Sequence, residues 1–395
     1  MSRFSFFTER PIEKYKKADT ALVILTFLLW GIGMVTLYFC SSGFGQRAFG
    51  NSLHFVERQL ISSAVGFAAL FFFASIKFDA VRKLLPMIVF GAIILCLLTF
   101  IPGIGVERNG ARRWIKIPYF STFQPSEAIK FALVLFLANF FDKQERIVLE
   151  EDKTVFPAFF GLIVFSGVVF AQQDFSTGLF VFLLGLVMFF VSGAKLSWFI
   201  PFSCLAIPAV FLMVLLKPYR VDRLIGFFSP ESYSQTINYQ TMAANRAISA
   251  GGFWGQGIGT GLTRINSIPE VQSDYVFAGW VEAMGLLGVI LYLAVLGMFA
   301  WRTYYCSLTC SDRFAALTTF GFATCLVAQS LANIAVVGGV MPTTGIPLPF
   351  FSSGGSSIIF TLAMCGFMIN ASRLENVELV ESNEYKTEEL MYECY

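Results

Sequence analysis

Long apolar runs recur along almost the whole chain, and they constrain its fold more than any other feature. Each run has about 17 to 25 residues, the length at which a helix crosses the hydrocarbon core of a bilayer. Apolar residues make up 56% of the chain and charged residues 14%, whereas soluble domains carry about 25% charged residues. The ten runs lie near residues 20–41, 59–77, 84–101, 125–141, 155–171, 176–192, 197–216, 275–301, 314–338 and 354–371. The sequence therefore predicts an all-α polytopic membrane protein with ten transmembrane helices.

Ten spans place both termini on one side of the membrane, and the basic residues indicate which side. More Lys and Arg fall in the segments that share a side with the N-terminus, so the positive-inside rule predicts that both termini are cytoplasmic. Four loops of unusual composition then lie on the outer face, namely 102–124, 171–176, 217–274 and 339–353. The third is a large loop between the seventh and eighth helices. We expect the chemistry of the protein at this face, where ATP is not available.

Composition divides the chain into three parts. Residues 1–18 form a polar, basic tail, residues 19–372 form the membrane domain, and residues 373–395 form an acidic tail with few apolar residues, for which we expect disorder in the cytoplasm. The formal net charge of +2 gives no indication of nucleic-acid binding. A single His and eight Cys without a CxxC pair predict neither a zinc site nor a disulfide framework.

The stretch from Pro269 to Gly285 places one acid, Asp274, where the large outer loop meets an apolar helix. A carboxylate at a membrane boundary can be partly desolvated, which suits it to proton abstraction. The simpler interpretation is that Asp274 caps the helix, since Ser and Asp are favoured at helix starts. The stretch by itself favours the cap.

The first outer loop carries cations beside a polar helix start. Arg112 and Arg113 flank Trp114 and suit bidentate phosphate contact, although Arg and Trp also anchor proteins at membrane surfaces. Glu127 and Lys130 are three residues apart at the start of the fourth span, so they share a helix face and can pair. An ion pair that enters the membrane indicates either a functional site or a structural closure of the bundle.

The other three outer loops carry further candidates. Asp174, between the fifth and sixth spans, is predicted to cap the sixth helix or to add a second carboxylate to the outer cavity. The run 249–261 is rich in Gly and lacks the dinucleotide-binding pattern, so it indicates a flexible hinge over a cavity better than a phosphate loop. The last loop combines three prolines with the run 353–357, whose backbone N–H groups at a helix start favour anions.

These motifs together resemble the SEDS family of bacterial cell-wall polymerases, whose members are of the FtsW, RodA and SpoVE types. The matching pieces occur in the family's order over about residues 20–372: Asn109 to Trp114, Gln124 to Lys130, Asp174 with Ser176 and Thr177, Tyr239 with Gln240, Gly251 to Gly259, Pro269 with Glu270, Ser273 to Phe277, Glu282 with Gly285, and Pro342 to Ser356. The form of the 109–114 motif resembles the division branch, FtsW, more than the elongation branch, RodA.

The resemblance implies a peptidoglycan glycosyltransferase with ten helices in the bacterial cytoplasmic membrane, most of all at the division septum. Such proteins polymerise lipid II on the outer face and work with a class B penicillin-binding protein that cross-links the product, among other division proteins. Their acceptor hydroxyl needs a base and their departing pyrophosphate needs positive charge. A precursor flippase, an elongation-type polymerase and a non-catalytic scaffold are the alternatives.

The resemblance also assigns roles to residues of this chain. It implies that Asp274 is the catalytic base, with Arg112, Arg113 and Lys130 as candidates for the pyrophosphate and Glu127 orienting Lys130. The resemblance implies no definite cofactor. It is compatible with a divalent cation, Mg²⁺ or Mn²⁺, for which Asp274 is the candidate ligand. The remaining predicted substrate-binding residues are Asp174, Gln240, Glu282, Ser352 and Ser356. The chain departs from the family pattern at Gln173, Ser273, Tyr275, Ala283 and Ser353.

Overall fold

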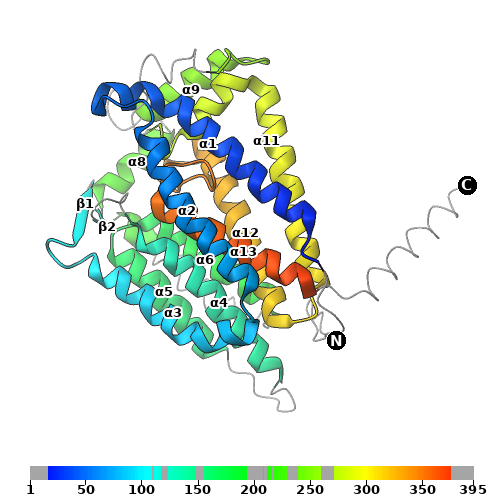
Figure 1. Ribbon diagram of the computed structural model, residues 1–395. Coiled ribbons are helices and arrows are strands. Elements are labelled where there is room, and N and C mark those ends of the chain that lie inside the picture. The colour runs from blue at the N-terminus through cyan, green and yellow to red at the C-terminus, as the bar shows by residue number, and fades with distance from the viewer. Residues whose placement is uncertain are drawn as a thin grey trace, which may run out of the picture.

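The computed structural model is a bundle of long helices with its polar loops gathered at one end (Figure 1). It describes residues 17–108, 111–116, 123–146, 155–193, 208, 211–215, 217–228, 239–258 and 271–374. The predicted N-terminal tail, the acidic tail beyond residue 374 and most of the seventh span, 197–216, lie outside the described residues. The proposed division into a membrane domain and two tails therefore stays a prediction.

Nine of the ten predicted spans coincide with helices in the described part of the chain. These helices are α1 (Thr20–Phe49), α2 (His54–Ser75), α3 (Phe78–Leu98), α4 (Pro125–Arg146), α5 (Phe156–Ala171), α6 (Phe175–Val191), α11 (Val276–Thr309), α12 (Arg313–Val337) and α13 (Gly355–Ala371). Among the described residues, six helices are long and apolar enough to cross a membrane, and α5 and α6 are shorter apolar helices. A multi-pass membrane protein follows, while the number of ten spans and their orientation stay predictions.

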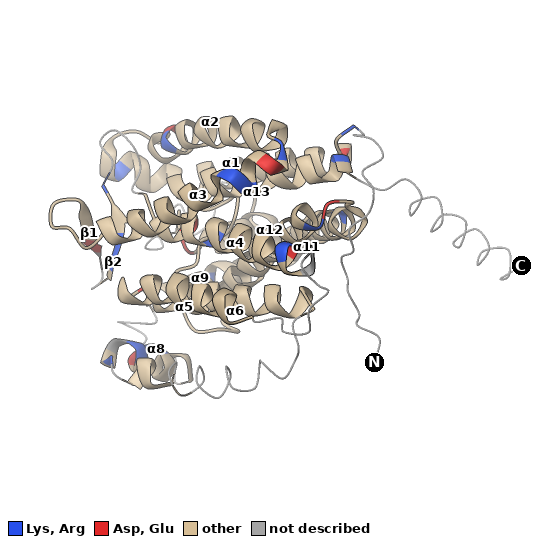
Figure 2. Cartoon of the chain, turned by 90° about the horizontal axis from the view of Figure 1, so that it is seen from below, with Lys and Arg blue, Asp and Glu red and all other residues tan. Residues whose placement is uncertain are grey.

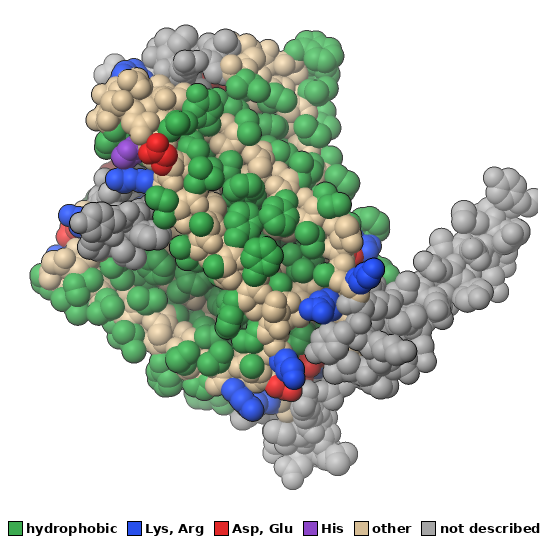
Figure 3. All heavy atoms as spheres, in the orientation of Figure 1, with side chains coloured by type: hydrophobic (Ala, Val, Ile, Leu, Met, Phe, Trp, Pro, Cys, Tyr) green, Lys and Arg blue, Asp and Glu red, His purple; other side chains and the backbone are tan. Residues whose placement is uncertain are grey.

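The surface of the bundle agrees with a membrane environment. Apolar side chains cover the middle of the face over α1 and α2, and charged side chains lie toward its two ends (Figure 3). The Lys, Arg, Asp and Glu residues that Figure 2 colours lie mostly toward the helix ends, with few along the helices. Hydrocarbon cannot solvate charge, so a lipid-facing helix surface has this distribution.

Helix α4 is the exception in composition, and its position explains why. Its residues from 126 to 135 are all buried, and it contacts α3, α5, α6, α12 and α13. A helix surrounded by protein can carry Glu127 and Lys130, because neighbouring helices, and not lipid, meet their side chains. The polar fourth span is therefore the centre of the bundle.

The sequence pattern did not predict four elements at the loop end, two strands and two helices. Strands β1 (Gly105–Arg108) and β2 (Ala111–Ile115) pair antiparallel in the first outer loop, so the domain is not purely helical. The dipeptide Asn109–Gly110 between them is the commonest sequence for a tight hairpin turn, and this signal could have predicted the strands. The large outer loop contains two helices, α8 (Pro218–Phe228) and α9 (Tyr239–Gly251).

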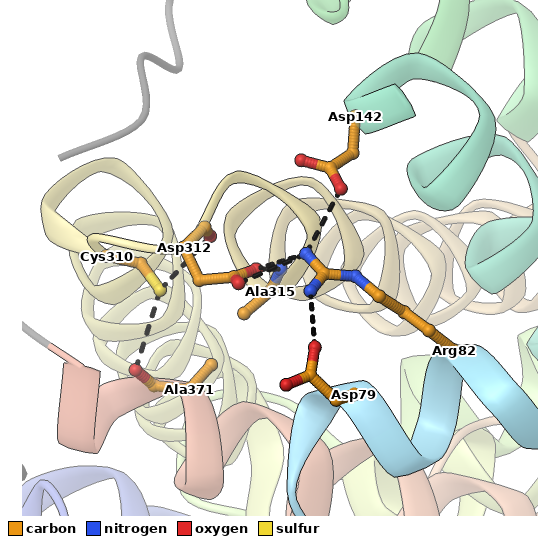
Figure 4. Close-up of polar contacts among 7 residues, drawn as sticks. All are labelled: Asp79, Arg82, Asp142, Cys310, Asp312, Ala315 and Ala371. Atoms are coloured by element: carbon orange, nitrogen blue, oxygen red, sulfur yellow. Dashed lines mark hydrogen bonds and ion pairs between the residues drawn. The ribbon is translucent and has the colours of Figure 1, made fainter. Parts of the chain in front are cut away.

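The opposite end of the bundle is closed by ion pairs. Arg82 of α3 donates to Asp79 at 3.0 Å, to Asp142 of α4 at 3.1 Å and to Asp312 at 3.1 Å (Figure 4). Asp312 also caps α12 by accepting the backbone N–H of Ala315 at 2.8 Å. One arginine thus joins three helices at the end away from the loops.

The first and last described α-helices, α1 and α13, meet at this same closed end. Asp19 caps α1, pairs with Arg302 near the end of α11 and donates its backbone N–H to Ser372 after α13 at 3.0 Å. The start of α1 and the end of α13 therefore lie on the same side, as an even number of spans requires.

Candidate functional site

Two cavities lie side by side among the loops at the open end of the bundle. The smaller, of about 90 Å³, has mostly polar walls, and the larger, of about 610 Å³, extends along apolar side chains of α6 and α12. Both are lined by Arg113, Arg223, Thr343, Thr344 and Ile346. These shared residues form the boundary between a polar compartment and an apolar one.

Asp274 lines the smaller cavity, half-buried, just before α11 begins at Val276. The N-cap of α11 is Tyr275, which makes no side-chain capping bond. The structure therefore places Tyr275, and not Asp274, at the N-cap position of α11. A methyl group added to Gly345 would lie 3.5 Å from Oδ2 of Asp274 and 3.9 Å from both Nη atoms of Arg113. The carboxylate and the guanidinium therefore border the same small space.

Of the two adjacent arginines, only Arg113 reaches the cavities. A β-bulge separates their directions: Glu107 pairs with Arg112 and Val106 with Trp114, so Arg113 is the extra, unpaired residue between the two pairs. Arg112 is more than half exposed and pairs with Glu107 across the hairpin at 3.0 Å. Arg113 is 22% exposed, and its Nη1 lies 3.4 Å from Asp174. The sequence predicted both arginines as substrate ligands, and the structure places Arg113 alone beside Asp274.

Asp174 both caps α6 and lines a cavity, the two alternatives that the sequence left open. It caps α6 by accepting the backbone N–H of Thr177 at 3.4 Å, and it pairs with Arg113 while lining the larger cavity. Its other oxygen accepts a hydrogen bond from the Gln124 side chain at 3.2 Å, and the Gln124 backbone N–H donates to Ser356 at 2.9 Å. Ser356 thus supports Asp174 through Gln124 and does not line either cavity.

Glu127 and Lys130 form the predicted ion pair, deep inside the bundle. Their atoms are 2.7 Å apart, and Lys130 also donates to Gln329 of α12 at 2.7 Å. Both side chains are at most 4% exposed and line neither cavity. Because protein atoms surround Lys130, it lacks the direct access to a pyrophosphate that the sequence analysis expected.

Three cations complete the rim of the larger cavity, one just before α8 and two within it, and we call them the cations of α8. The sequence pattern did not assign them to the site. Lys217, Arg220 and Arg223 all line the larger cavity, and Arg223 donates to the Thr343 carbonyl at 3.0 Å. Burial lowers the pKa of Arg220, although an arginine keeps its charge at neutral pH. The three cations are each three residues apart, a spacing that puts them on one helix face and that could have identified them.

The Gly-rich segment is a packing element in the part that the structure describes, up to residue 258. Helix α11 is broken at Gly285, whose φ is +64°. The carbonyls of Glu282 and Ala283 accept the backbone N–H groups of Gln256 and Gly257, at 2.9 and 3.1 Å. The segment therefore satisfies backbone groups that the break releases, which the interior of a membrane protein requires. The predicted flexible hinge is thus a close backbone contact; Gly259 and Gly261 lie outside the described residues.

The remaining predicted residues divide between the cavity wall and its support. Gln240 of α9 lines the smaller cavity with Asp274. Glu282 is buried in α11, one turn before the break, and lines neither cavity. Ser352 accepts the Leu348 backbone N–H at 2.7 Å and donates to the Ser273 carbonyl, so it connects the last outer loop with the residue before Asp274. The structure therefore shows the Ser352 hydroxyl bonded to backbone groups of the protein, whereas the sequence predicted that it binds substrate.

Comparison with known proteins gives consistent matches over nearly the whole chain. The family model FtsW/RodA/SpoVE, described as "Cell cycle protein", matches residues 20–377. The chain is 33% identical to "Stage V sporulation protein E" of Bacillus subtilis, over 91% of this chain and 98% of that protein. It is 31% identical to "Probable peptidoglycan glycosyltransferase FtsW" of Geobacter sp. strain M18, over 92% of this chain and 98% of that protein.

Solved structures have the same fold. A chain from the study "Structural coordination of polymerization and crosslinking by a peptidoglycan synthase complex" superposes with a TM-score of 0.71 at 26% identity, over 91% of this chain and 99% of that one. The rod shape determining protein RodA of Thermus thermophilus superposes with a TM-score of 0.64 over 90% of this chain and 97% of that one, and its 24% identity supports the fold alone. The chain belongs to the FtsW/RodA/SpoVE family of cell cycle proteins.

Proposed function

We propose that the protein is a peptidoglycan glycosyltransferase that polymerises lipid II into glycan strands. The observation that carries this proposal is the position of Asp274 and Arg113 around one small polar space that opens beside a long apolar cavity. A lipid-linked saccharide has the same division into a polar head and an apolar chain. The FtsW relatives are named peptidoglycan glycosyltransferases, which agrees with this chemistry.

Asp274 is the general base of the proposed reaction. Its carboxylate takes the proton from the C4 hydroxyl of the acceptor saccharide, and the hydroxyl oxygen attacks C1 of the donor. The bond between C1 and the pyrophosphate oxygen breaks, and the polyprenyl pyrophosphate leaves with the electron pair. A base works when it lies within hydrogen-bond reach of the proton it takes, so the position of Asp274 on the cavity wall is the essential feature.

Positive charge for the departing pyrophosphate comes from Arg113 together with the cations of α8. Arg113 and Arg223 line both cavities, and Lys217 and Arg220 line the larger one. Fixed cations stabilise negative charge that develops on a leaving group, and they do so most strongly where water is excluded. This group replaces Arg112 and Lys130 in the role that the sequence analysis gave them.

The apolar cavity suits the lipid chain of the substrate. Its walls include Leu179, Leu183, Val187, Ala328 and Ala332, which come from α6 and α12. An isoprenoid chain on these side chains would keep the pyrophosphate at the cationic rim. No soluble activated sugar is needed, because both donor and acceptor arrive in the membrane.

The described residues around Asp274 fit a resident divalent cation poorly. Asp274 is the single carboxylate of the smaller cavity, where it faces the guanidinium groups of Arg113 and Arg223. Among the residues that the structure describes, no three His, Cys, Asp or Glu side chains gather as metal ligands. Divalent cations prefer several carboxylate or carbonyl oxygens, so the mechanism proposed here takes no step through a metal.

The setting of the reaction follows the family. We place the protein in the bacterial cytoplasmic membrane with ten spans, both termini inside and the two cavities on the outer face, most of all at the division septum. A solved relative belongs to a peptidoglycan synthase complex that polymerises and cross-links. We therefore expect a class B penicillin-binding protein as partner, alongside other division proteins.

Purified protein in nanodiscs, incubated with labelled lipid II, tests the proposed function. A ladder of glycan strands is the expected product, separated on a gel and digestible by a muramidase. The reaction is run with and without the partner transpeptidase and with and without Mg²⁺, to define what activity requires. A flippase would move lipid II between leaflets of a liposome without making glycan, and that result would overturn the proposal.

A further inference from the structure

Asn333 connects α12 with the backbone of Asp274. Its side chain is 2% exposed, and its Nδ2 donates to the carbonyl of Asp274 at 3.0 Å and to that of Ile346 at 2.9 Å. Both acceptors are carbonyls, so the hydrogen-bond network determines which end of the amide is nitrogen. One buried side chain therefore holds the start of α11 and the last outer loop in a defined relation.

The segment before α11 is held by three consecutive carbonyl groups. The Gln272 carbonyl accepts the Ser353 backbone N–H at 2.7 Å, the Ser273 carbonyl accepts the Ser352 hydroxyl, and the Asp274 carbonyl accepts Asn333. Ser352 and Ser353 belong to the last outer loop, whereas Asn333 belongs to α12. The bond from α12 is therefore the one that ties this segment to the rigid centre of the bundle.

Gln329 makes the matching connection one helical turn earlier. Its Nε2 donates to the Pro347 carbonyl at 2.9 Å, and its Oε1 accepts from Lys130 at 2.7 Å. Residues four apart share a helix face, so Gln329 and Asn333 hold the neighbouring carbonyls of Pro347 and Ile346. The Glu127–Lys130 pair of α4 thus reaches the cavity wall through Gln329.

We propose that Asn333 is a positioning residue of the glycosyl transfer, supported by Gln329 and the ion pair behind it. It holds Asp274 and the wall at Gly345–Ile346 together, so that the carboxylate and Arg113 face one space. This inference rests on the proposed function. It gives Glu127 and Lys130 a role that acts through the backbone, in place of the direct substrate contact expected from the sequence. A displacement of about 1 Å in a reacting group can cost on the order of 100-fold in rate.

The chain offers a matched control in Asn370 of α13. This side chain is 3% exposed, and its Nδ2 donates to two backbone carbonyls, those of Phe73 at 3.0 Å and Ile76 at 2.6 Å. Asn333 makes the same pair of hydrogen bonds. Those of Asn370 are at the end of α2, and Asn370 lines neither cavity. Leucine is branched at Cγ like asparagine and has no donor, so the same substitution removes the same bonds, and adds the same bulk, at both places.

The experiment compares Asn333→Leu with Asn370→Leu in nanodiscs. We measure kcat and KM for lipid II, thermal unfolding, and backbone hydrogen exchange in peptides that cover residues 271–275. We expect Asn333→Leu to lower kcat by about 10- to 100-fold with KM changed less than about threefold, because position and not binding is lost. Exchange of the 271–275 segment should rise. Asn370→Leu should lower the unfolding temperature similarly and leave kcat within about threefold of wild type.

Three outcomes would overturn the inference: an equal loss of kcat in both variants, a raised KM with unchanged kcat in Asn333→Leu, or unchanged exchange of residues 271–275. If Asn333→Leu does not fold, Asn333→Ser, which keeps one donor, should show a smaller loss of kcat at constant KM. If the wild-type protein makes no glycan, the proposed function is contradicted. The hydrogen-exchange comparison would still test whether Asn333 holds the Asp274 backbone in place.

Discussion

At the scale of single residues, the backbone explains which charges meet the cavities. Arg112 and Arg113 are neighbours in sequence, and the β-bulge at Arg113 leaves one paired with exposed Glu107 and the other with Asp174. A motif match treats the two as equivalent, since it records order and not direction. The local structure of the hairpin therefore decides which arginine can act on a substrate.

The two arginines form a matched pair for mutation. Arg113→Gln should lower kcat/KM for lipid II by at least 10-fold, because it removes charge from both cavities and leaves Asp174 buried without its cation. Arg112→Gln should stay within about twofold, since it breaks an exposed pair worth at most about 1 kcal/mol. Steady-state polymerisation rates of both variants provide the test. Equal losses would show that the hairpin does not select Arg113.

At the scale of elements, the break in α11 is the feature that joins this helix to the Gly-rich segment. Gly285 has a left-handed backbone, and the Gly-rich segment lies directly against it. The sequence showed an unbroken apolar run and a separate Gly-rich loop, so it predicted a continuous helix and a flexible hinge. Neither pattern reveals that the Gly-rich segment forms hydrogen bonds with the backbone groups that the break in α11 releases, because these bonds join residues about thirty positions apart.

Substitution of Gly285 tests this contact. An added Cβ would lie 2.4 Å from the Gly255 nitrogen and 2.5 Å from the Phe253 carbonyl oxygen, and a left-handed φ costs an L-residue about 1–2 kcal/mol. Gly285→Ala should therefore lower the unfolding temperature and reduce polymerisation. Gly297→Ala is the control, because a Cβ at Gly297 meets nothing within 4 Å and helix propensity improves. Comparable unfolding temperatures for the two variants would contradict this account of the break.

At the scale of the whole molecule, one end of the bundle is closed by ion pairs and the other carries the cavities. The pattern of apolar runs predicted nine of the observed helices and their approximate limits, because spanning length and hydropathy are local properties. It also predicted that the four unusual loops share one side. The two cavities, the α8 cations and the support by Asn333 depend on contacts between distant segments, which periodicity does not encode.

The closed end supplies stability and not chemistry. Arg82→Gln should destabilise the bundle by roughly 3 kcal/mol, because Asp142 and Asp312, at 2% and 11% exposure, lose a shared cation. Asp79→Asn should change stability by less than about 1 kcal/mol, since Asp79 is 82% exposed. Thermal unfolding in detergent gives both values. A large loss of kcat in folded Arg82→Gln protein would mean that this end takes part in the reaction.

Thiol labelling tests the proposed orientation. Trp254 and Asp79 are exposed at opposite ends of the bundle. In a Cys204→Ser and Cys394→Ser background, where the six described cysteines are all buried, an impermeant maleimide should label Trp254→Cys in intact cells. Asp79→Cys should be labelled only after the membrane is opened. The reverse pattern would place the cavities in the cytoplasm.

The proposed mechanism depends on Asp274, and a second carboxylate provides a matched control for its substitution. Single-turnover polymerisation of lipid II is measured for Asp274→Asn beside Asp222→Asn, which removes a carboxylate of α8 that lines neither cavity. We predict that Asp274→Asn loses at least about 100-fold in rate, the size of a missing general base, while it still binds lipid II and the partner. Asp222→Asn should match wild type. Glycan made by Asp274→Asn at the wild-type rate would contradict the account.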